Sequence, residues 1–366
     1  MEAFVHEALP GRVVFGVGAV GQVADEVAAL GLGRVLVVAG GSSKAVGDRI
    51  ADDLGDRCAG RLDEVRQHVP EELAATARRT AVEARADGVV TVGGGSAIGL
   101  GKAIAVNPDT PGSRGRVTVV AVPTTYSGSE MTPIFGVTGE HKHTGRDLRA
   151  LPRVVVYDPA LTVGLPPTVT AASGFNALAH CVEAMYAPGT NPVVELQAIE
   201  GIRSLAGALP QAVERPDDLD ARGRALYGGY LAGTAFAVAG TALHHKLCHV
   251  LGGSFGLVHG DVNAVVLPHV VAYNADAAPD AMAAIASALG AADGQAGQAA
   301  GELYDLAHRI GAPTSLAALG MPADRLDAAA ERAVAETGTT NPRPPDTASL
   351  RALLQRAFDG APPISI

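Results

Sequence analysis

Short runs of aliphatic residues alternate with longer amphipathic stretches over the first 160 positions of the chain. Four of the runs are continuous and apolar, as strands are when both faces of a parallel sheet are covered. These runs are Val35–Ala39, Val89–Val92, Val117–Val122 and Val154–Tyr157. Between them, stretches such as Val20–Leu30 and Glu71–Ala86 place apolar residues at helical spacing. The alternation predicts βαβ units and an α/β domain over residues 1–160.

After Asp158-Pro159 the strand pattern ends, and Ala- and Leu-rich segments with helical spacing follow. The predicted helices are Ala171–Tyr186, Pro192–Leu209, Arg222–Ala239, His244–Phe255, Pro279–Leu289 and Gly301–Ile310. Leu267-Pro268-His269 is predicted to be a turn that enters a helix. This change of pattern predicts a second, all-helical domain over residues 161–366. We expect ligands to bind where two such domains face each other.

Composition and charge exclude several classes of protein. The 366-residue chain is 48% hydrophobic and 18% charged, as folded proteins are, and its net charge is −10. It has no Lys- or Arg-rich run, so we expect no nucleic-acid partner. It also has no apolar run of roughly 18 residues and no leader pattern, so we expect no membrane partner and a cytoplasmic location.

Two glycine motifs follow predicted strands. Gly16–Gly21 fits GxGxxG, but Gly40 stands at the end of the next strand where a dinucleotide site would carry an acid. A tight strand-to-helix turn is therefore the favoured interpretation of this motif. Gly93-Gly94-Gly95-Ser96 lies between a continuous strand and a predicted helix at Ala97–Val106. Uncovered backbone amides at a helix N-terminus bind phosphate groups, so these four residues are the predicted pyrophosphate turn.

Hydroxyl side chains follow the third continuous strand. Thr124, Thr125 and Ser127 come directly after Val117–Val122. Ligands bind at the carboxyl ends of parallel strands, which makes these residues cofactor candidates. Hydroxyls also serve ordinary turns and helix caps, and the sequence leaves both interpretations open.

Histidines are concentrated in the middle of the chain at regular spacing. Asn176 and His180 are four residues apart in one predicted helix, and His245 and His249 repeat that spacing in another. His259 follows ten residues later, in a predicted turn. Residues at i and i+4 share a helix face. These side chains are therefore candidates either for binding a divalent ion or for donating protons.

These motifs resemble those of the iron-containing alcohol dehydrogenase family over nearly the whole chain. The matching segments are Gly93–Ser96, Pro123–Thr125, Asp158-Pro159, Ser173–Ala184, His245–Gly260 and Leu267–His269. The resemblance implies the fold that this family shares with dehydroquinate synthase. That fold is an N-terminal α/β dinucleotide-binding domain followed by an all-α C-terminal catalytic domain, usually in a homodimer. It also implies that Gly93–Ser96 hold the pyrophosphate and that Thr124 and Thr125 lie along the cofactor.

Two departures from the family pattern change these expectations. Metal-binding members use one Asp and three His, and Asn176 stands here at the Asp position. The corresponding set here contains no anionic ligand, so we do not expect a bound iron or zinc ion. Any ion that did bind would use Asn176, His180, His245 and His259. Gly40 stands where NAD-preferring members carry an acid against the ribose, so we expect both NADH and NADPH to be used.

Within the family, four segments are most similar to members that reduce a double bond in an unsaturated oxo-diacid. They are Pro123–Thr132, Ala171–Ala184, Leu243–Gly253 and Asn341–Pro344. The resemblance implies hydride addition from NADH or NADPH to the alkene carbon β to a ketone, followed by protonation of the α carbon. It further implies a small oxo-diacid substrate and a role in the degradation of aromatic compounds.

This reaction sets expected roles for the candidate residues. His249 is the candidate proton donor, because imidazole titrates near neutral pH. Lys246 and Arg343 are the candidate partners of the substrate carboxylates, and Lys142 is a candidate near the cofactor. An enolate oxygen needs hydrogen-bond donors. The expected donors are His180, His245 and His259, around Asn176.

Two alternatives are weighed against this interpretation. One is a metal-dependent alcohol or polyol dehydrogenase of the same family, with Asn176 as a tolerated ligand. The other is a cyclase similar to dehydroquinate synthase, which uses NAD without net redox change. A cyclase of that kind needs several cations around a phosphate-bearing substrate, and the lysine-poor helical half disfavours it.

Overall fold

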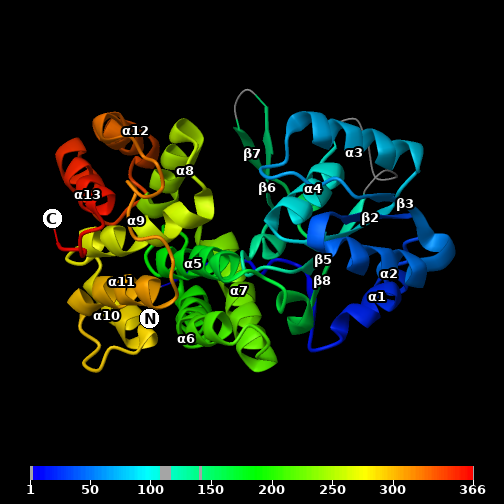
Figure 1. Ribbon diagram of the computed structural model, residues 1–366, viewed down its shortest axis with the longest axis horizontal. Helices are drawn as coiled ribbons and strands as arrows, with labels where there is room; N and C mark the ends of the chain where they lie inside the picture. The colour runs from blue at the N-terminus through cyan, green and yellow to red at the C-terminus, as the bar shows by residue number, and fades with distance from the viewer. Residues whose placement is uncertain (1–2, 108–116, 140–141, 366) are drawn as a thin grey trace. The chain divides into compact units, whose positions relative to one another are not determined.

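The computed structural model describes residues 3–107, 117–139 and 142–365. The chain divides into two compact units, Leu9–Gly164 and Leu165–Ile366, and Met1–Ala8 belongs to the second unit. The sequence predicted the division at 160–161 and assigned the first eight residues to the first domain. The predicted fold class is confirmed, since the first unit is an α/β domain and the second is built of helices (Figure 1).

A six-stranded parallel sheet forms the centre of the first unit, in the order β1-β8-β5-β4-β2-β3. Its strands are β1 (Arg12–Phe15), β2 (Val35–Ala39), β3 (Cys58–Leu62), β4 (Gly88–Gly93), β5 (Thr118–Pro123) and β8 (Val154–Tyr157). Every residue of β2, β4 and β8 is buried, which explains their continuous aliphatic runs. The edge strands β1 and β3 are partly exposed, so they lack this pattern and were not predicted.

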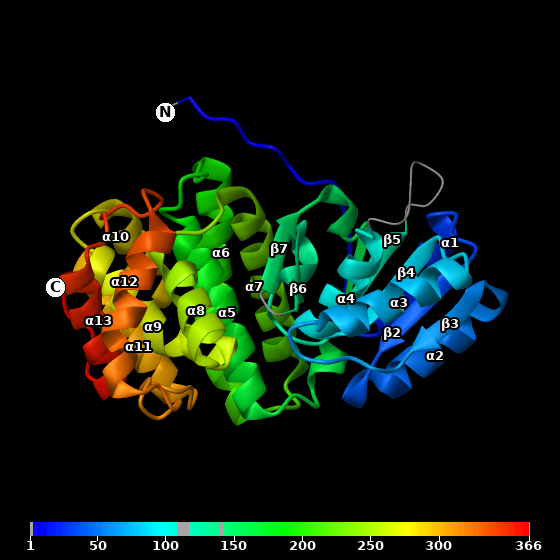
Figure 2. The same ribbon diagram turned by 90° about the horizontal axis from the view of Figure 1, so that it is seen from above.

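Helices cover both faces of this sheet. They are α1 (Val23–Ala29), α2 (Lys44–Leu54), α3 (Glu71–Glu83) and α4 (Gly95–Ala105). Val35 and Val37 of β2 pack with α1 and α2, whereas Leu36 and Val38 pack with α3 and α4. Side chains of a strand alternate between its two faces, so one apolar run serves both helix layers (Figures 1 and 2).

An antiparallel hairpin of β6 (Ile134–Thr138) and β7 (Lys142–Arg146) follows β5 and was not predicted from the sequence. Its two strands form a separate sheet from the parallel one. A two-stranded sheet of this length depends on packing against its neighbours. Val137 of β6 supplies that packing, because it belongs to the apolar cluster formed with α3 and α4.

The strand order identifies where this sheet can bind a ligand. β2 lies between β3 and β4 in the sheet. The strand that follows β2 in sequence, β3, pairs with one of its edges, and the next strand, β4, pairs with the other. In parallel sheets, ligands bind at the carboxyl edge where the strand order reverses in this way. The turns after β2 and β4 meet there, since a Cβ added to Gly93 would lie 3.7 Å from the Ser43 hydroxyl oxygen.

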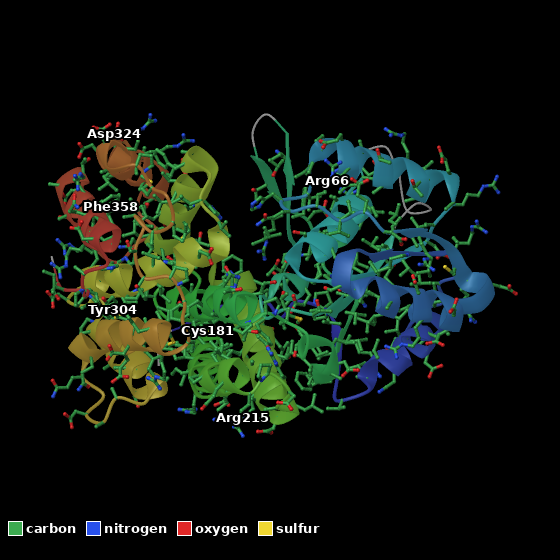
Figure 3. The ribbon with its side chains drawn as sticks, viewed as in Figure 1. Arg66, Cys181, Arg215, Tyr304, Asp324 and Phe358 are labelled. Atoms are coloured by element: carbon green, nitrogen blue, oxygen red, sulfur yellow. The ribbon has the colours of Figure 1, made fainter. Side chains whose placement is uncertain are left out.

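Nine helices longer than one turn make up the described part of the second unit. They are α5 (Pro167–Ala184), α6 (Pro192–Glu214), α7 (Leu219–Ala239), α8 (Leu243–Phe255), α9 (His259–Asn274), α10 (Pro279–Leu289), α11 (Ala299–Arg309), α12 (Leu326–Thr337) and α13 (Thr347–Asp359). Each of the six predicted helices corresponds to one of these. Glycine lets helices α5 and α6 pack closely, because a side chain at Gly201 of α6 would collide with Cys181 of α5. Figure 3 shows Cys181 in the interior of this unit.

The prediction of a turn at Leu267-Pro268-His269 is wrong, because these residues lie inside α9. Proline lacks the N–H that an interior helical position normally donates and usually ends a helix. Here every residue from Val262 to Asn274 is buried, so tertiary packing holds the helix across Pro268. A helix that is buried all round shows no amphipathic period, and its sequence therefore carried no clear helical signal.

Among the described residues, no single helix has the length and apolarity needed to cross a membrane. One bent pair, α7 with α8, meets the criterion only when its two helices are taken together.

A fully buried lysine ties α4 to the segment after β5. Lys102 Nζ donates hydrogen bonds to the carbonyl oxygens of Ser129 at 2.6 Å and of Thr132 and Ile134 at 2.8 Å. Burial lowers the pKa of Lys102 to about 7. Glu130, also fully buried, accepts a hydrogen bond from the Tyr157 hydroxyl at 2.7 Å. Lys102 thus holds the chain directly beyond the hydroxyl residues that follow β5.

We expect Lys102→Met to lower the free energy of unfolding by about 3 kcal/mol or more, because three buried carbonyls lose their donor. Urea unfolding followed by circular dichroism measures the change. Lys44→Met is the control, since Lys44 is an exposed lysine with only surface ion pairs and should cost less than about 1 kcal/mol. Equal losses in the two variants would contradict a clamping role for Lys102.

Candidate functional site

The predicted pyrophosphate turn lies at the carboxyl end of β4. Gly93 ends the strand, Gly94 is the N-cap of α4, and Gly95 is its first residue. A Cβ would lie 2.9 Å from Ala97 Cβ if added to Gly93, and 3.0 Å from Thr125 Cγ2 if added to Gly94. The N-cap makes no side-chain hydrogen bond. The helix therefore begins with backbone amides that no side chain covers, as an anion site requires.

The hydroxyl residues after β5 lie against this turn. The Thr124 N–H donates to the Gly93 carbonyl oxygen at 3.1 Å, and the Ser127 hydroxyl oxygen is 3.6 Å from the Cβ position of Gly95. Since Gly94 packs on Thr125, the structure brings all the predicted cofactor residues of these two turns together. Lys142 begins β7, and its side chain lies outside the described part of the structure.

Gly40, in the turn after β2, is required by close packing. A Cβ at this position would lie 2.7 Å from the Asp63 carbonyl oxygen and 3.0 Å from Val65 Cβ. An acid at position 40 would therefore displace the segment after β3. The Asp63 carboxylate is paired with Lys44 and Arg61, and the hydrogen bond from Lys44 holds the pKa of Asp63 below its usual value.

Four histidines of the helical unit form a continuous series of ring contacts, which we call the histidine cluster. The His180 ring of α5 stacks on His245 of α8, with centroids 4.8 Å apart. His245 meets His249 edge-on at 6.5 Å, and His249 stacks on His259 at 5.8 Å. His259 is the first residue of α9, so its predicted position in a turn is corrected. The i, i+4 pairs on separate helices thus converge.

A fully buried carboxylate joins α5 to the start of α8. Glu183 accepts hydrogen bonds from the backbone N–H groups of Ala242 at 3.1 Å and His244 at 2.6 Å, and from Nδ1 of His245 at 2.6 Å. Burial raises the pKa of Glu183, and these donors oppose that shift. Glu183 was not predicted as a site residue from the sequence. The available signal was its position three residues after His180, on the same helix face.

The rings at the buried end of the histidine cluster are neutral. Burial lowers the pKa of His245 to about 3, with a further contribution from His249 and Lys246, and it lowers that of His180 well below its usual value. His245 Nε2 and His180 Nδ1 are buried without a hydrogen-bond partner among the described residues. Because a carboxylate only accepts, Nδ1 of His245 carries the proton and Nε2 carries the lone pair.

A second buried chain of hydrogen bonds orients Asn176. Its Oδ1 accepts from Nδ2 of Asn263 at 2.8 Å, and Asn263 Oδ1 lies 3.0 Å from Nε2 of His244. Asn263 and His244 are both fully buried. The amide oxygen of Asn176, which a metal would need, therefore already accepts one hydrogen bond from Asn263. Neither Asn263 nor His244 was predicted to have a role, because both act through contacts between α8, α9 and α5.

Lys246 and Phe236 complete the surroundings of His245. Lys246 is half-buried, and its ammonium makes no ion pair or hydrogen bond with the residues that the structure describes. Phe236 of α7 stacks on His180 at 4.3 Å and lies 5.3 Å from the His245 ring. An apolar ring and a cation close to His245 suit a ligand that carries negative charge.

Arg343 lies against the last turn of α9. Its guanidinium is 4.1 Å from the ring centroid of Tyr273 and donates to the Tyr273 carbonyl at 3.4 Å. Tyr273 is separated from His259 by about 21 Å of helix, at 1.5 Å per residue. Asn341 fastens the same segment through a pair of amide hydrogen bonds with Asn274. Arg343 thus lies at the opposite end of α9 from His259, whereas Asn341 of the same segment accepts a hydrogen bond from the Leu243 N–H at the start of α8.

The side chains do not form a metal-ligand group as they stand. Within residues 3–107, 117–139 and 142–365, no three His, Cys, Asp or Glu side chains are arranged to hold an ion. Asn176 is neutral and bonded to Asn263. The predicted set of one Asn and three His contains no anionic ligand. The structure adds a carboxylate beside this set, that of Glu183, which is a partner of His245.

Family models and known proteins match this chain over nearly its full length. The model described as iron-containing alcohol dehydrogenase matches residues 10–159. The model described as the C-terminal part of the Fe-containing alcohol dehydrogenase family matches residues 170–358. The chain is 47% identical over 364 residues to the maleylacetate reductase of Burkholderia cepacia. This match covers 99% of this chain and 100% of that protein.

Solved structures agree with this similarity. The maleylacetate reductase from Agrobacterium tumefaciens is 46% identical with a TM-score of 0.92, and the match covers 99% of this chain and 100% of that one. The maleylacetate reductase from Rhizobium sp. strain MTP-10005 is 45% identical with a TM-score of 0.92, at the same coverage.

We expect Gly94→Ala to weaken NADH binding about tenfold or more, or about 1.4 kcal/mol, because its methyl group would cover the α4 amides and crowd Thr125. Fluorescence titration with NADH measures the dissociation constant. Gly99→Ala is the matched control, since its methyl also meets a neighbour at 3.0 Å, Val69, but away from the turn. An equal effect of both substitutions would contradict the placement of the cofactor.

Proposed function

The chain belongs to the iron-containing alcohol dehydrogenase family, and from this premise we propose that it reduces maleylacetate to 3-oxoadipate with NADH or NADPH. It is an oxidoreductase. The substrate assignment is carried by the histidine cluster beside Lys246, whose ammonium has no partner among the described residues, in a chain 47% identical to a maleylacetate reductase. A neutral imidazole surface next to one cation suits a substrate that is anionic and forms an enolate.

The reaction places definite demands on the residues of this chain. Maleylacetate has a double bond conjugated to a ketone and carries two carboxylates. When bound, the reduced nicotinamide supplies a hydride to the alkene carbon β to the ketone. Negative charge then develops on the ketone oxygen, and the α carbon must take up a proton. The site therefore needs a proton donor, groups that stabilise an oxyanion, and at least one cation for a carboxylate.

His249 is the residue we assign to protonation of the α carbon. Its side chain is exposed, so it can recover a proton from solvent after each turnover. It contacts His245 on one side and His259 on the other. His180, His245 and His259 are assigned to the enolate oxygen, with Asn176 held beside them by Asn263. Neutral rings at rest avoid the cost of burying several positive charges together.

Lys246 is the cation we assign to a substrate carboxylate. The sequence suggested both Lys246 and Arg343, but the guanidinium of Arg343 lies on the Tyr273 ring and donates to the Tyr273 carbonyl. Lys246 follows His245 in the first turn of α8, so a carboxylate bound there would lie close to the reacting groups.

The cofactor preference follows from the turn after β2. Gly40 leaves no carboxylate to repel a 2′-phosphate, and the nearby Asp63 is neutralised by Lys44 and Arg61. We therefore assign both NADH and NADPH as donors. We further assign the chain to the cytoplasm, as a homodimer acting in the degradation of aromatic compounds. The cyclase alternative requires that NADH is not consumed, so stoichiometric oxidation of NADH with maleylacetate separates the two.

We expect Lys246→Ala to raise the KM for maleylacetate roughly 10- to 100-fold, because a charge-assisted contact to a carboxylate is lost. The KM for NADH should change less than about twofold, since the cofactor turn belongs to the other unit. Steady-state kinetics with each substrate varied in turn measures both values. Lys246→Arg keeps the charge and is expected to recover part of the loss. A KM for maleylacetate that Lys246→Ala leaves unchanged would remove Lys246 from the site.

We expect the enzyme to keep its activity after treatment with a chelator, because Asn176 replaces the anionic ligand and is bonded to Asn263. NADH oxidation with maleylacetate is followed before and after dialysis against chelator, with metal content measured on the same samples. Loss of activity that zinc or iron restores would contradict this expectation. It would favour the second candidate, a metal-dependent alcohol or polyol dehydrogenase.

A further inference from the structure

The carboxylate of Glu183 is fully buried and has all its described partners on α8 and the residue before it. Oε1 accepts from the His244 N–H, and Oε2 accepts from the Ala242 N–H and from Nδ1 of His245. The two backbone groups lie at the start of α8, where N–H groups have no acceptor within the helix. Capping explains those two hydrogen bonds, but it does not explain the third, which goes to a side chain.

The third hydrogen bond sets the state of the His245 ring. Because Nδ1 donates to Glu183, the neutral ring has its lone pair on Nε2. Nε2 is buried and has no partner in the described part of the chain. The ring is also held in place by stacking on His180 and by contact with Phe236. Any proton that His245 shares with a ligand must therefore be shared at Nε2.

We propose that Glu183 is a positioning residue, which holds His245 in the tautomer and orientation that place Nε2 at the substrate oxygen. The inference rests on the proposed function, because the oxygen in question is that of the enolate. The 2.6 Å hydrogen bond between Glu183 and Nδ1 keeps the ring from turning and from changing tautomer, so Nε2 stays on the side of the ring that faces away from Glu183. Glu183 itself touches neither substrate nor cofactor.

The first measurement concerns the hydrogen bond and needs no substrate. In proton NMR spectra of the ¹⁵N-histidine-labelled protein, the Nδ1–H of His245 should give a protected low-field signal. Glu183→Gln should remove it, because one amide cannot accept from all three donors. His245→Gln should remove the same signal, which assigns it without relying on the Glu183 variant. A low-field signal that persists in His245→Gln, or no such signal in the wild type, would overturn the proposal.

The second measurement separates positioning from helix capping. Glu183→Gln should lower kcat for maleylacetate roughly 10- to 100-fold, with the KM for NADH changed less than about twofold. The matched control is Asn341→Ala, which removes a buried acceptor of the Leu243 N–H in the same turn without touching His245. It should reduce thermal stability but keep kcat and the low-field signal. Equal kcat in Glu183→Gln and the wild type would reduce Glu183 to a capping residue.

These readouts distinguish the two proposals. If maleylacetate is not the substrate, the wild type itself will not oxidise NADH with it, while the low-field signal and its loss in Glu183→Gln remain. If only the Glu183 proposal fails, the wild type reduces maleylacetate, and the signal or the kcat effect is missing. Should Glu183→Gln not fold, the comparison of the wild type with His245→Gln still decides, because it tests the hydrogen bond directly.

Discussion

The buried carboxylate of Glu183 is the interaction on which the site in the helical unit depends. It joins α5, which carries Asn176 and His180, to the start of α8, which carries His245, Lys246 and His249. A buried charge is unfavourable unless donors surround it. Here the unsatisfied amides of a helix start and one imidazole meet that requirement together. The same hydrogen bonds therefore stabilise the fold and fix a ring of the site.

The remaining polar groups around this centre follow the same rule. His244, Asn263 and Asn176 form a buried series in which each group has a partner on another helix. Burial lowers the pKa of His180, His244 and His245, so these three rings can lie close together without mutual repulsion. Lys246 is the exception, because its charge has no described partner. An acidic chain with a net charge of −10 thus carries a local cation that suits the anionic substrate we propose.

In the α/β unit, the controlling constraint is steric. Gly93 and Gly94 have no room for side chains, and Thr125 and Ser127 lie against the turn. Gly40 likewise has no room for a side chain, because Asp63 and Val65 of the segment after β3 pack against it. Lys102 fastens the chain beyond the hydroxyl residues to α4 through three carbonyl groups. The cofactor turn is consequently a rigid assembly of backbone, which suits a pyrophosphate group better than a flexible loop does.

The sequence by itself determined those features that leave a local pattern. Strands buried on both faces are continuous aliphatic runs, so β2, β4, β5 and β8 were predicted. The spacing of His245 and His249 placed both on one helix face. Only the tertiary structure decided the partners of these residues. Glu183 lies about 60 positions from the turn that it caps, and Asn263 lies 87 from Asn176. Such contacts depend on which helices pack together, and neither hydrophobic period nor motif spacing carries that information.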